Sequence, residues 1–219
     1  MAILRYSSDG TKLPQYGLDR KRLADLEPAL AAARDEVLAD ATLWASGDEV
    51  PPAKNPLDAG FIELPDRLLA DYRQNPATSE VGQIKVKANS IADAFDRVIL
   101  LGIGGSYMGA RAIFEGLCHP YHNDLPRPRR DRPRLYFEGN NVDNDSLASL
   151  IELIDQQNAA EPDGQRWLLV VISKSGGTLE TAVAFRILLR HLAAECKGAQ
   201  TAIAERVVPI TGPNGRLAL

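Results

Sequence analysis

Four short runs in the second half of the chain are apolar nearly throughout instead of alternating with polar residues. They are Val98–Leu101, Arg134–Phe137, Trp167–Ile172 and Val207–Ile210. This pattern is typical of strands that are buried on both faces of a sheet. Segments with helical spacing separate the runs, at 107–117, 147–154 and 179–197. Strands that alternate with helices predict an α/β fold, a doubly wound parallel sheet flanked by helices.

The first 95 residues have helical periodicity instead. Apolar residues recur at helical spacing between Leu18 and Val37, and Trp44–Gly47 ends this pattern. Four prolines in 50–65 predict an extended surface loop, and further helices are expected from Pro65 and over 79–95. We interpret 1–95 as a helical N-terminal region that packs on the core. Residues 96–219 then form the α/β domain, which we expect to be truncated at its C-terminal end.

Composition and charge narrow the classes of function. The net charge is −4 and the calculated pI is about 5.5, which argues against nucleic-acid binding through a basic face. A local anion site is still compatible with an acidic protein. No apolar run approaches the roughly 18 residues of a membrane helix, and the N-terminus has no apolar signal segment. We therefore expect a cytoplasmic protein that binds neither nucleic acid nor membrane.

Cysteine usage predicts reduced thiols and no metal centre. The two cysteines, Cys118 and Cys196, lie in or near apolar helical stretches. Cys118, His119 and His122 could suggest a metal cluster, but no second ligand group occurs at metal-site spacing. A polar helix end that runs into Pro120 is the interpretation we favour, and we predict no cofactor.

Two loops carry the chemistry that the sequence reveals. Gly102–Ser106 and Ser173–Thr178 both follow predicted strands, where parallel sheets bind ligands. The second loop holds three hydroxyls, one lysine and two glycines in six residues, at the start of a helix whose free N–H groups favour phosphate. Either loop alone could be an ordinary strand-to-helix turn capped by Ser or Thr. Both loops together, with Lys174 among the hydroxyls, favour a phosphate site.

Other phosphate and hydrolase signatures fit less well. A dinucleotide fingerprint would need a glycine where Tyr107 stands, and neither loop closes with Gly-Lys-Ser/Thr. The chain has no G-x-S-x-G elbow. These differences favour a small phosphate ester over a nucleotide.

Three segments resemble motifs of the glucose-6-phosphate isomerase family. Leu101–Gly109 is similar to its G-I-G-G-S-x-x-G segment, and Ser173–Thr181 to its S-K-[ST]-x-[TG]-T-x-E-T segment. Phe137–Asp143 resembles the family's strand-to-helix stretch that ends in N-x-D. The resemblance covers about 98–212 well, and the segment before it only in helical character.

The resemblance implies a sugar-isomerase (SIS) domain, a sugar phosphate as ligand and a homodimer when full length. It places a phosphate group among Ser106, Ser173, Lys174, Ser175 and Thr178. Gly104 and Gly105 would let the substrate approach the first loop. Gly177 stands where many members have threonine, so a hydroxyl donor is missing that a backbone N–H could replace. Glu180 matches a position that supports a catalytic histidine, but an acid in the first helical turn is equally explained by the helix dipole.

The implied reaction is reversible aldose–ketose isomerisation of glucose 6-phosphate. The family's arginine motif, glutamate base, histidine and C-terminal lysine have no match here, and Gly215–Arg216 lacks the paired glycine of the arginine motif. We therefore expect an N-terminal fragment that lacks the main catalytic residues. Two alternatives stay open. They are another phosphosugar isomerase of the same fold, acting on an amino sugar or heptose phosphate, and a phosphosugar-sensing module.

Overall fold

The computed structural model describes residues 7, 9–11, 17, 19–160, 166–212 and 214–217. The chain divides into two units, Met1–Ile84 and Lys85–Leu219, and each is described by itself. The boundary falls inside helix α3, Glu80–Ala94. Packing of the helical region on the sheet stays a prediction.

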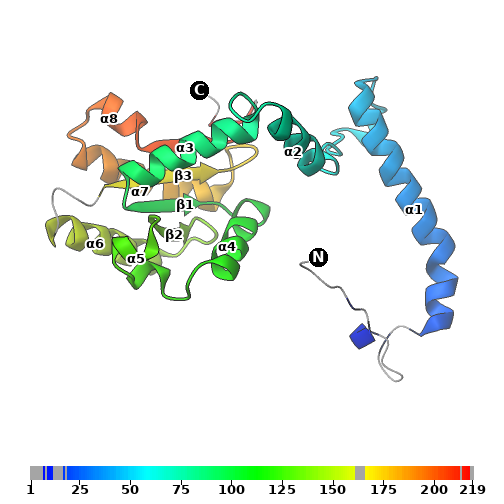
Figure 1. Ribbon diagram of the computed structural model, residues 1–219, viewed down its shortest axis with the longest axis horizontal. Coiled ribbons are helices and arrows are strands. Elements are labelled where there is room, and N and C mark those ends of the chain that lie inside the picture. The colour runs from blue at the N-terminus through cyan, green and yellow to red at the C-terminus, as the bar shows by residue number, and fades with distance from the viewer. Residues whose placement is uncertain are drawn as a thin grey trace. The chain divides into compact units, whose positions relative to one another are not determined.

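The first unit is helical, as predicted. Its elements are η1 (Asp9–Thr11), α1 (Arg20–Ser46), η2 (Pro52–Lys54), α2 (Leu64–Gln74) and the beginning of α3 (Figure 1). Helix α1 begins where Asp19 Oδ1 accepts a hydrogen bond from Arg22 N at 2.7 Å. It ends at Gly47, whose φ of 72° is left-handed and suits glycine. Leu18, the predicted start of the periodicity, lies outside the described residues.

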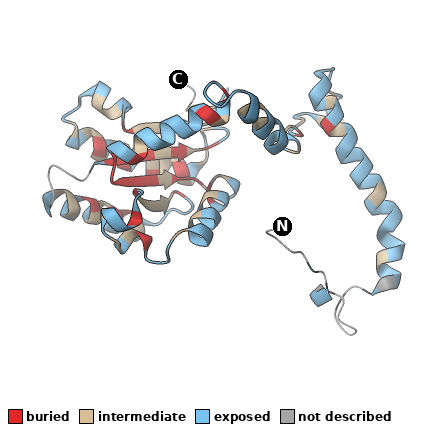
Figure 2. Cartoon of the chain, in the orientation of Figure 1, coloured by how far each residue is buried: buried red, intermediate tan, exposed pale blue. Residues whose placement is uncertain are grey.

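The apolar positions that predicted α1 are not buried in this unit. Leu26, Leu30 and Val37 are all exposed, and α1 is coloured mainly as exposed in Figure 2. The periodicity therefore predicted the helix but not its burial.

The second unit contains the predicted sheet. Its strands are β1 (Arg97–Leu101), β2 (Arg134–Glu138), β3 (Trp167–Ile172) and β4 (Val207–Ile210). All neighbours are parallel, in the order β2-β1-β3-β4. The apolar runs thus predicted the strands to within one residue. Buried residues concentrate on these strands in Figure 2.

Helices cover both faces of the sheet, so the doubly wound α/β fold is confirmed (Figure 1). The helices after β1 are α4 (Gly105–Leu117), η3 (His122–Asp124), α5 (Arg127–Arg130), α6 (Asn144–Ala160), α7 (Leu179–Glu195) and α8 (Gln200–Ala204). On one face, Ile154 of α6 and Leu188 of α7 pack in a core with Leu169 of β3. On the other face, Phe95 at the end of α3 packs with Leu168. The short helices α5 and α8 were not predicted, because each is too short to show a period.

Paired charges, several of them buried, gather at the amino ends of the strands. Asp96 accepts hydrogen bonds from Arg130 and Arg134, and Glu195 accepts from Arg206 at 2.6 Å and from Trp167 Nε1 at 2.7 Å. These ion pairs and hydrogen bonds hold the end of the sheet opposite to the two glycine-bearing loops.

Candidate functional site

The two predicted loops leave the sheet at its topological switch point. Strands β1 and β3 are neighbours, but the chain goes on from β1 to β2 in one direction and from β3 to β4 in the other. Right-handed crossovers then send α4 and α7 to opposite faces. The divergence opens a crevice at the carboxyl ends of β1 and β3, which is where such sheets bind ligands.

A cleft of about 700 Å³ occupies this crevice. It is lined by Ile103, Ser106, Ile172, Ser173, Lys174, Ser175, Thr178, Gly212, Asn214, Gly215 and Arg216. The structure thus brings all five predicted phosphate-contacting side chains to one cavity. Their role in binding stays a prediction.

The other predicted residues lie nearby without lining the cleft. Gly104, with φ of 56°, and Gly105 form the turn that begins α4, and both are exposed. The positive φ explains the glycine at 104. Glu180 is half-buried in the first turn of α7, and it lines neither this cleft nor the cavity beside it. Both interpretations of Glu180 stay open.

Serine hydroxyls hold the loop after β3 in shape. Ser173 Oγ accepts a hydrogen bond from Gly176 N, and Ser175 Oγ accepts one from Gly177 N, both at 3.1 Å. Ser173 Oγ also lies 3.3 Å from Thr178 Oγ1. A hydroxyl that accepts from an amide still has a proton to donate. The same side chains can therefore shape the turn and donate to an anion.

The helices that begin at the cleft have no side-chain cap. Thr178 stands at the N-cap of α7 but makes no capping hydrogen bond, and Gly104 has no side chain to cap α4. By contrast, Asp143 Oδ1 at the start of α6 accepts from the amides of Asp145 and Ser146, each at 3.0 Å. Uncapped N–H groups and the positive end of the helix dipole favour an anion. This makes the simple capping role for Thr178 the weaker interpretation.

A third loop, which sequence reasoning missed, completes the wall of the cleft. It follows β4 and is fastened to the 173–178 loop through the backbone. Ser173 N donates to Ile210 O at 3.0 Å, and Arg216 N donates to Ser175 O at 3.0 Å. Lys174 O accepts from Gly212 N at 3.2 Å. The position of this loop after a fourth parallel strand was the signal that could have revealed it.

A second cavity of about 450 Å³ adjoins the cleft. Ser173, Thr178 and Arg216 line both cavities, whereas apolar side chains such as Phe185, Leu189 and Leu217 line only the second. The polar end of the crevice is therefore the larger cleft.

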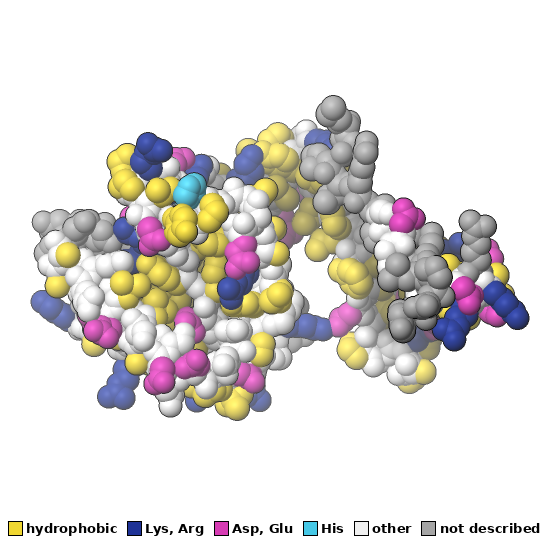
Figure 3. All heavy atoms as spheres, turned by 90° about the horizontal axis from the view of Figure 1, so that it is seen from below, with side chains coloured by type: hydrophobic (Ala, Val, Ile, Leu, Met, Phe, Trp, Pro, Cys, Tyr) yellow, Lys and Arg dark blue, Asp and Glu magenta, His cyan; other side chains and the backbone are white. Residues whose placement is uncertain are grey.

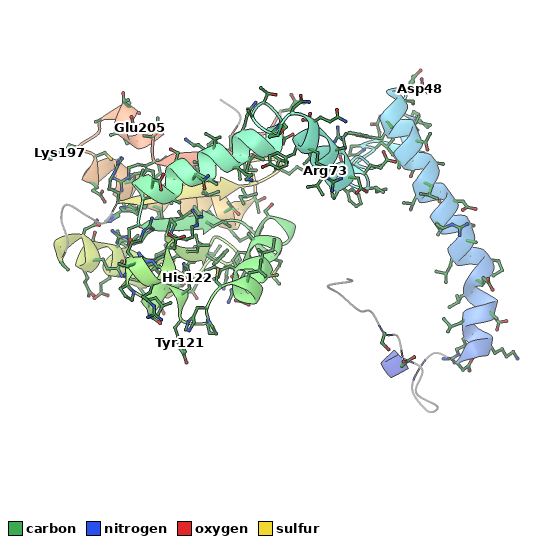
Figure 4. The ribbon with its side chains drawn as sticks, viewed as in Figure 1. Asp48, Arg73, Tyr121, His122, Lys197 and Glu205 are labelled. Atoms are coloured by element: carbon green, nitrogen blue, oxygen red, sulfur yellow. The ribbon has the colours of Figure 1, made fainter. Side chains whose placement is uncertain are left out.

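The histidines and cysteine of the considered metal cluster have other contacts. His122 is buried, its Nε2 lies 3.0 Å from Pro133 O, and its ring packs edge-on against Phe114. His119 Nδ1 accepts from Tyr121 N at 3.1 Å. Figure 4 shows His122 against the fold and Tyr121 pointing away from it. Within the described ranges, no group of three or more His, Cys, Asp or Glu side chains could hold a metal ion.

Positive charge in the cleft comes from Lys174 and Arg216. On the face of the molecule in Figure 3, by contrast, basic and acidic side chains are interspersed. As far as the chain is described, it contains no helix of the length and apolar character that crossing a membrane requires.

Fold and cleft define a doubly wound α/β protein with a polar cleft at its switch point. Part of the chain is similar to known proteins. The chain is 38% identical over 133 residues to glucose-6-phosphate isomerase of Acetivibrio thermocellus, which covers 61% of this chain and 26% of the relative. The enzymes of the same name from Alkaliphilus metalliredigens and Caldanaerobacter subterraneus are 37% and 39% identical, over 61% and 58% of the chain. The matched region is homologous to part of these isomerases.

The chain thus matches about a quarter of the length of these relatives. No family model matches it. A hypothetical protein from Thermus thermophilus has the same fold, with a TM-score of 0.55 and 19% identity over 92% of this chain and 40% of that one. A glucose-6-phosphate isomerase from Chlamydia trachomatis aligns with 61% of the chain and 23% of its own, at 28% identity and a TM-score of 0.39, too low to indicate a common fold by itself.

Proposed function

We propose that this chain is the phosphosugar-binding part of a glucose-6-phosphate isomerase. The observation that carries the proposal is the meeting of the 102–106 and 173–178 loops at one cleft, with hydroxyls, a lysine and an uncapped helix start. Homology to isomerases over 133 residues supports glucose 6-phosphate as the ligand.

The phosphate group lies in the cleft, where the Ser106, Ser173, Ser175 and Thr178 hydroxyls and the Lys174 ammonium surround it. The sugar extends into the open part of the crevice. Each hydrogen bond to a charged group contributes about 1.5–3 kcal/mol. Four or five such bonds suffice for micromolar affinity, about 8 kcal/mol, once the cost of association has been met.

The complete enzyme opens the sugar ring and then moves a proton between C1 and C2 through an enediol. This chemistry needs a base over those carbons, an acid for the ring oxygen and a cation for the enediolate. The motifs that supply these groups in the family do not occur in the 219 residues. We therefore propose that this chain binds the substrate without isomerising it. A cytoplasmic homodimer is the assembly that the resemblance suggests for the complete enzyme.

Titration of the ¹⁵N-labelled chain with glucose 6-phosphate, followed by amide shifts, tests the proposal. We expect saturable shifts in 102–106, 173–178 and 211–217. Glucose is the matched control, because it lacks the phosphate group and should cause no comparable shifts. Shifts confined to residues 1–90, or equal shifts with glucose, would contradict the proposal.

A further inference from the structure

Arg216 is a cation at the border of both cavities, on the loop that follows β4. Its backbone N–H is bonded to Ser175 O at 3.0 Å, so the start of its side chain is held beside the 173–178 loop. Its guanidinium extends over Gly177, because a Cβ built on that glycine would lie 3.8 Å from Arg216 Nη1. This places a planar group of N–H donors next to the predicted phosphate position.

The guanidinium of Arg216 differs from the arginines of the core. Asp96 forms ion pairs with Arg130 and Arg134, and Glu195 forms one with Arg206. In the part of the chain that the structure describes, no carboxylate forms an ion pair with Arg216, and its side chain is exposed. Its charge is therefore available to a ligand.

The guanidinium lies beside the small residue at 177. The nearest atoms to a Cβ at Gly177 are Ser175 Oγ at 3.7 Å and two guanidinium atoms of Arg216, at 3.8 and 3.9 Å. Gly177 lacks the hydroxyl donor that a threonine would offer there. Arg216 brings N–H donors to the same side of the loop from a different element.

We propose that Arg216 is a phosphate-binding residue, whose guanidinium binds the phosphate group of the ligand from beside Gly177. This inference rests on the proposed function, because it concerns the same cleft. Guanidinium presents parallel N–H donors that match two phosphate oxygens, whereas an ammonium acts as a point charge. With Lys174 it places two positive charges around a group that carries nearly two negative ones at neutral pH.

The test is the dissociation constant of the full 219-residue chain for glucose 6-phosphate and for inorganic phosphate, measured by calorimetry. Arg216→Gln should weaken both by about tenfold or more, the loss of one charge-assisted hydrogen bond. Arg216→Lys keeps the charge but loses the paired donors, and should fall between wild type and Arg216→Gln. Arg190→Gln is the matched control, since Arg190 is an exposed arginine of α7 that lines neither cavity. Its dissociation constants should stay within about twofold of wild type.

A second measurement reports on the side chain directly. The Arg216 Nε–H resonance should shift on addition of inorganic phosphate but not of glucose. If wild type binds and Arg216→Gln binds equally well, this inference is wrong and the proposed function stands. If wild type binds neither phosphate nor glucose 6-phosphate, the proposed function fails as well. Equal weakening by Arg190→Gln would show a long-range charge effect and would also overturn the inference.

Discussion

Ser173 and Thr178 close the 173–178 loop on itself, with their hydroxyl oxygens 3.3 Å apart at its two ends. Ser173 is buried and accepts from a loop amide, whereas Thr178 is half-buried and makes no cap on α7. The two side chains therefore offer the same hydroxyl group but differ in burial and in their hydrogen bonds to the backbone. This inequality leads to the first prediction.

Thr178→Ala should weaken binding of glucose 6-phosphate by about 1–3 kcal/mol, because a phosphate donor is lost. The free energy of unfolding should change by no more than about 1 kcal/mol, since no capping bond is broken and only the long hydrogen bond to Ser173 is lost. Thr178→Ser, which keeps the hydroxyl, is the control and should retain most of the affinity. Calorimetry and urea unfolding measure the two quantities. A loss of stability without a loss of affinity would mean that the hydroxyl only supports the helix.

Gly176→Ala should disturb the contact between the second and third loops. Gly176 has a φ of 65°, and a Cβ there would lie 2.8 Å from the backbone nitrogens of Arg216 and Leu217. Left-handed strain alone costs an alanine about 1–2 kcal/mol, and the close approach adds to it. We expect urea unfolding to show a loss of that size or more.

The neighbouring glycine provides the control for this variant. Gly177→Ala would place its Cβ no closer than 3.7 Å to its neighbours, at a φ that is not in the left-handed region. Its free energy of unfolding should stay within about 0.5 kcal/mol of wild type. Equal effects at the two positions would show that the third loop is not packed on Gly176.

Glu195→Gln should reveal the contribution of the paired carboxylate at the far end of the sheet. Burial raises the pKa of Glu195, but hydrogen bonds from Arg206 and Trp167 and the charge of Arg206 together outweigh it, so the pKa is lowered from 4.5. The resulting stabilisation is present above that ordinary value and is lost as pH falls through the lower pKa of the folded state. At neutral pH we expect Glu195→Gln to cost up to about 1 kcal/mol, because the side chain is 34% exposed and solvent screens the ion pair.

The difference in stability between wild type and Glu195→Gln should then shrink as pH drops below about 4.5. Thermal unfolding from neutral to acidic pH checks this. Glu205→Gln is the control, because Glu205 is exposed at the end of α8, where Figure 4 labels it. A pH-independent difference would argue against a charge effect.

The 219-residue chain alone should not isomerise glucose 6-phosphate. Without a base over C1 and C2 no proton is transferred, and positioning of reacting groups accounts for about 7–11 kcal/mol of a barrier. A coupled assay for fructose 6-phosphate, with the Acetivibrio thermocellus isomerase as positive control, measures this. Turnover within about tenfold of that control, a barrier difference of about 1.4 kcal/mol, would require a base among Glu138, Asp143 and Glu180.

The sheet could be predicted from sequence because its strands are buried on both faces. Ile99, Trp167 and Leu169 have no exposed surface. Because both faces of these strands are buried, their residues are apolar at successive positions and form recognisable runs. The same pattern placed two glycine-bearing loops at carboxyl ends of strands, whereas the structure shows that these two strands are neighbours at a switch point. Helix burial was harder to predict. The helical spacing of apolar residues in α1 indicates a helix but does not determine whether those residues are buried.

Arg216 was missed for a different reason. The family's arginine motif has two glycines before the arginine, whereas Gly215–Arg216 has only one. The sequence therefore offered no reason to assign Arg216 to the site. Its place in the cleft depends instead on β4 lying beside β3 and on backbone hydrogen bonds between residues about forty positions apart. Backbone hydrogen bonds of this kind do not depend on residue type, so the sequence does not reveal them.

Backbone bonds between the second and third loops also bear on the thermodynamics of binding. Ordering a loop residue costs about 1–2 kcal/mol of conformational entropy. Here Ser173 is already bonded to Ile210 at the end of β4, and Lys174 and Ser175 are bonded to the segment after it, at 3.0, 3.2 and 3.0 Å. These three residues are therefore held in place before a ligand binds, and we expect a phosphate ester in this cleft to lose little affinity to ordering of the loop.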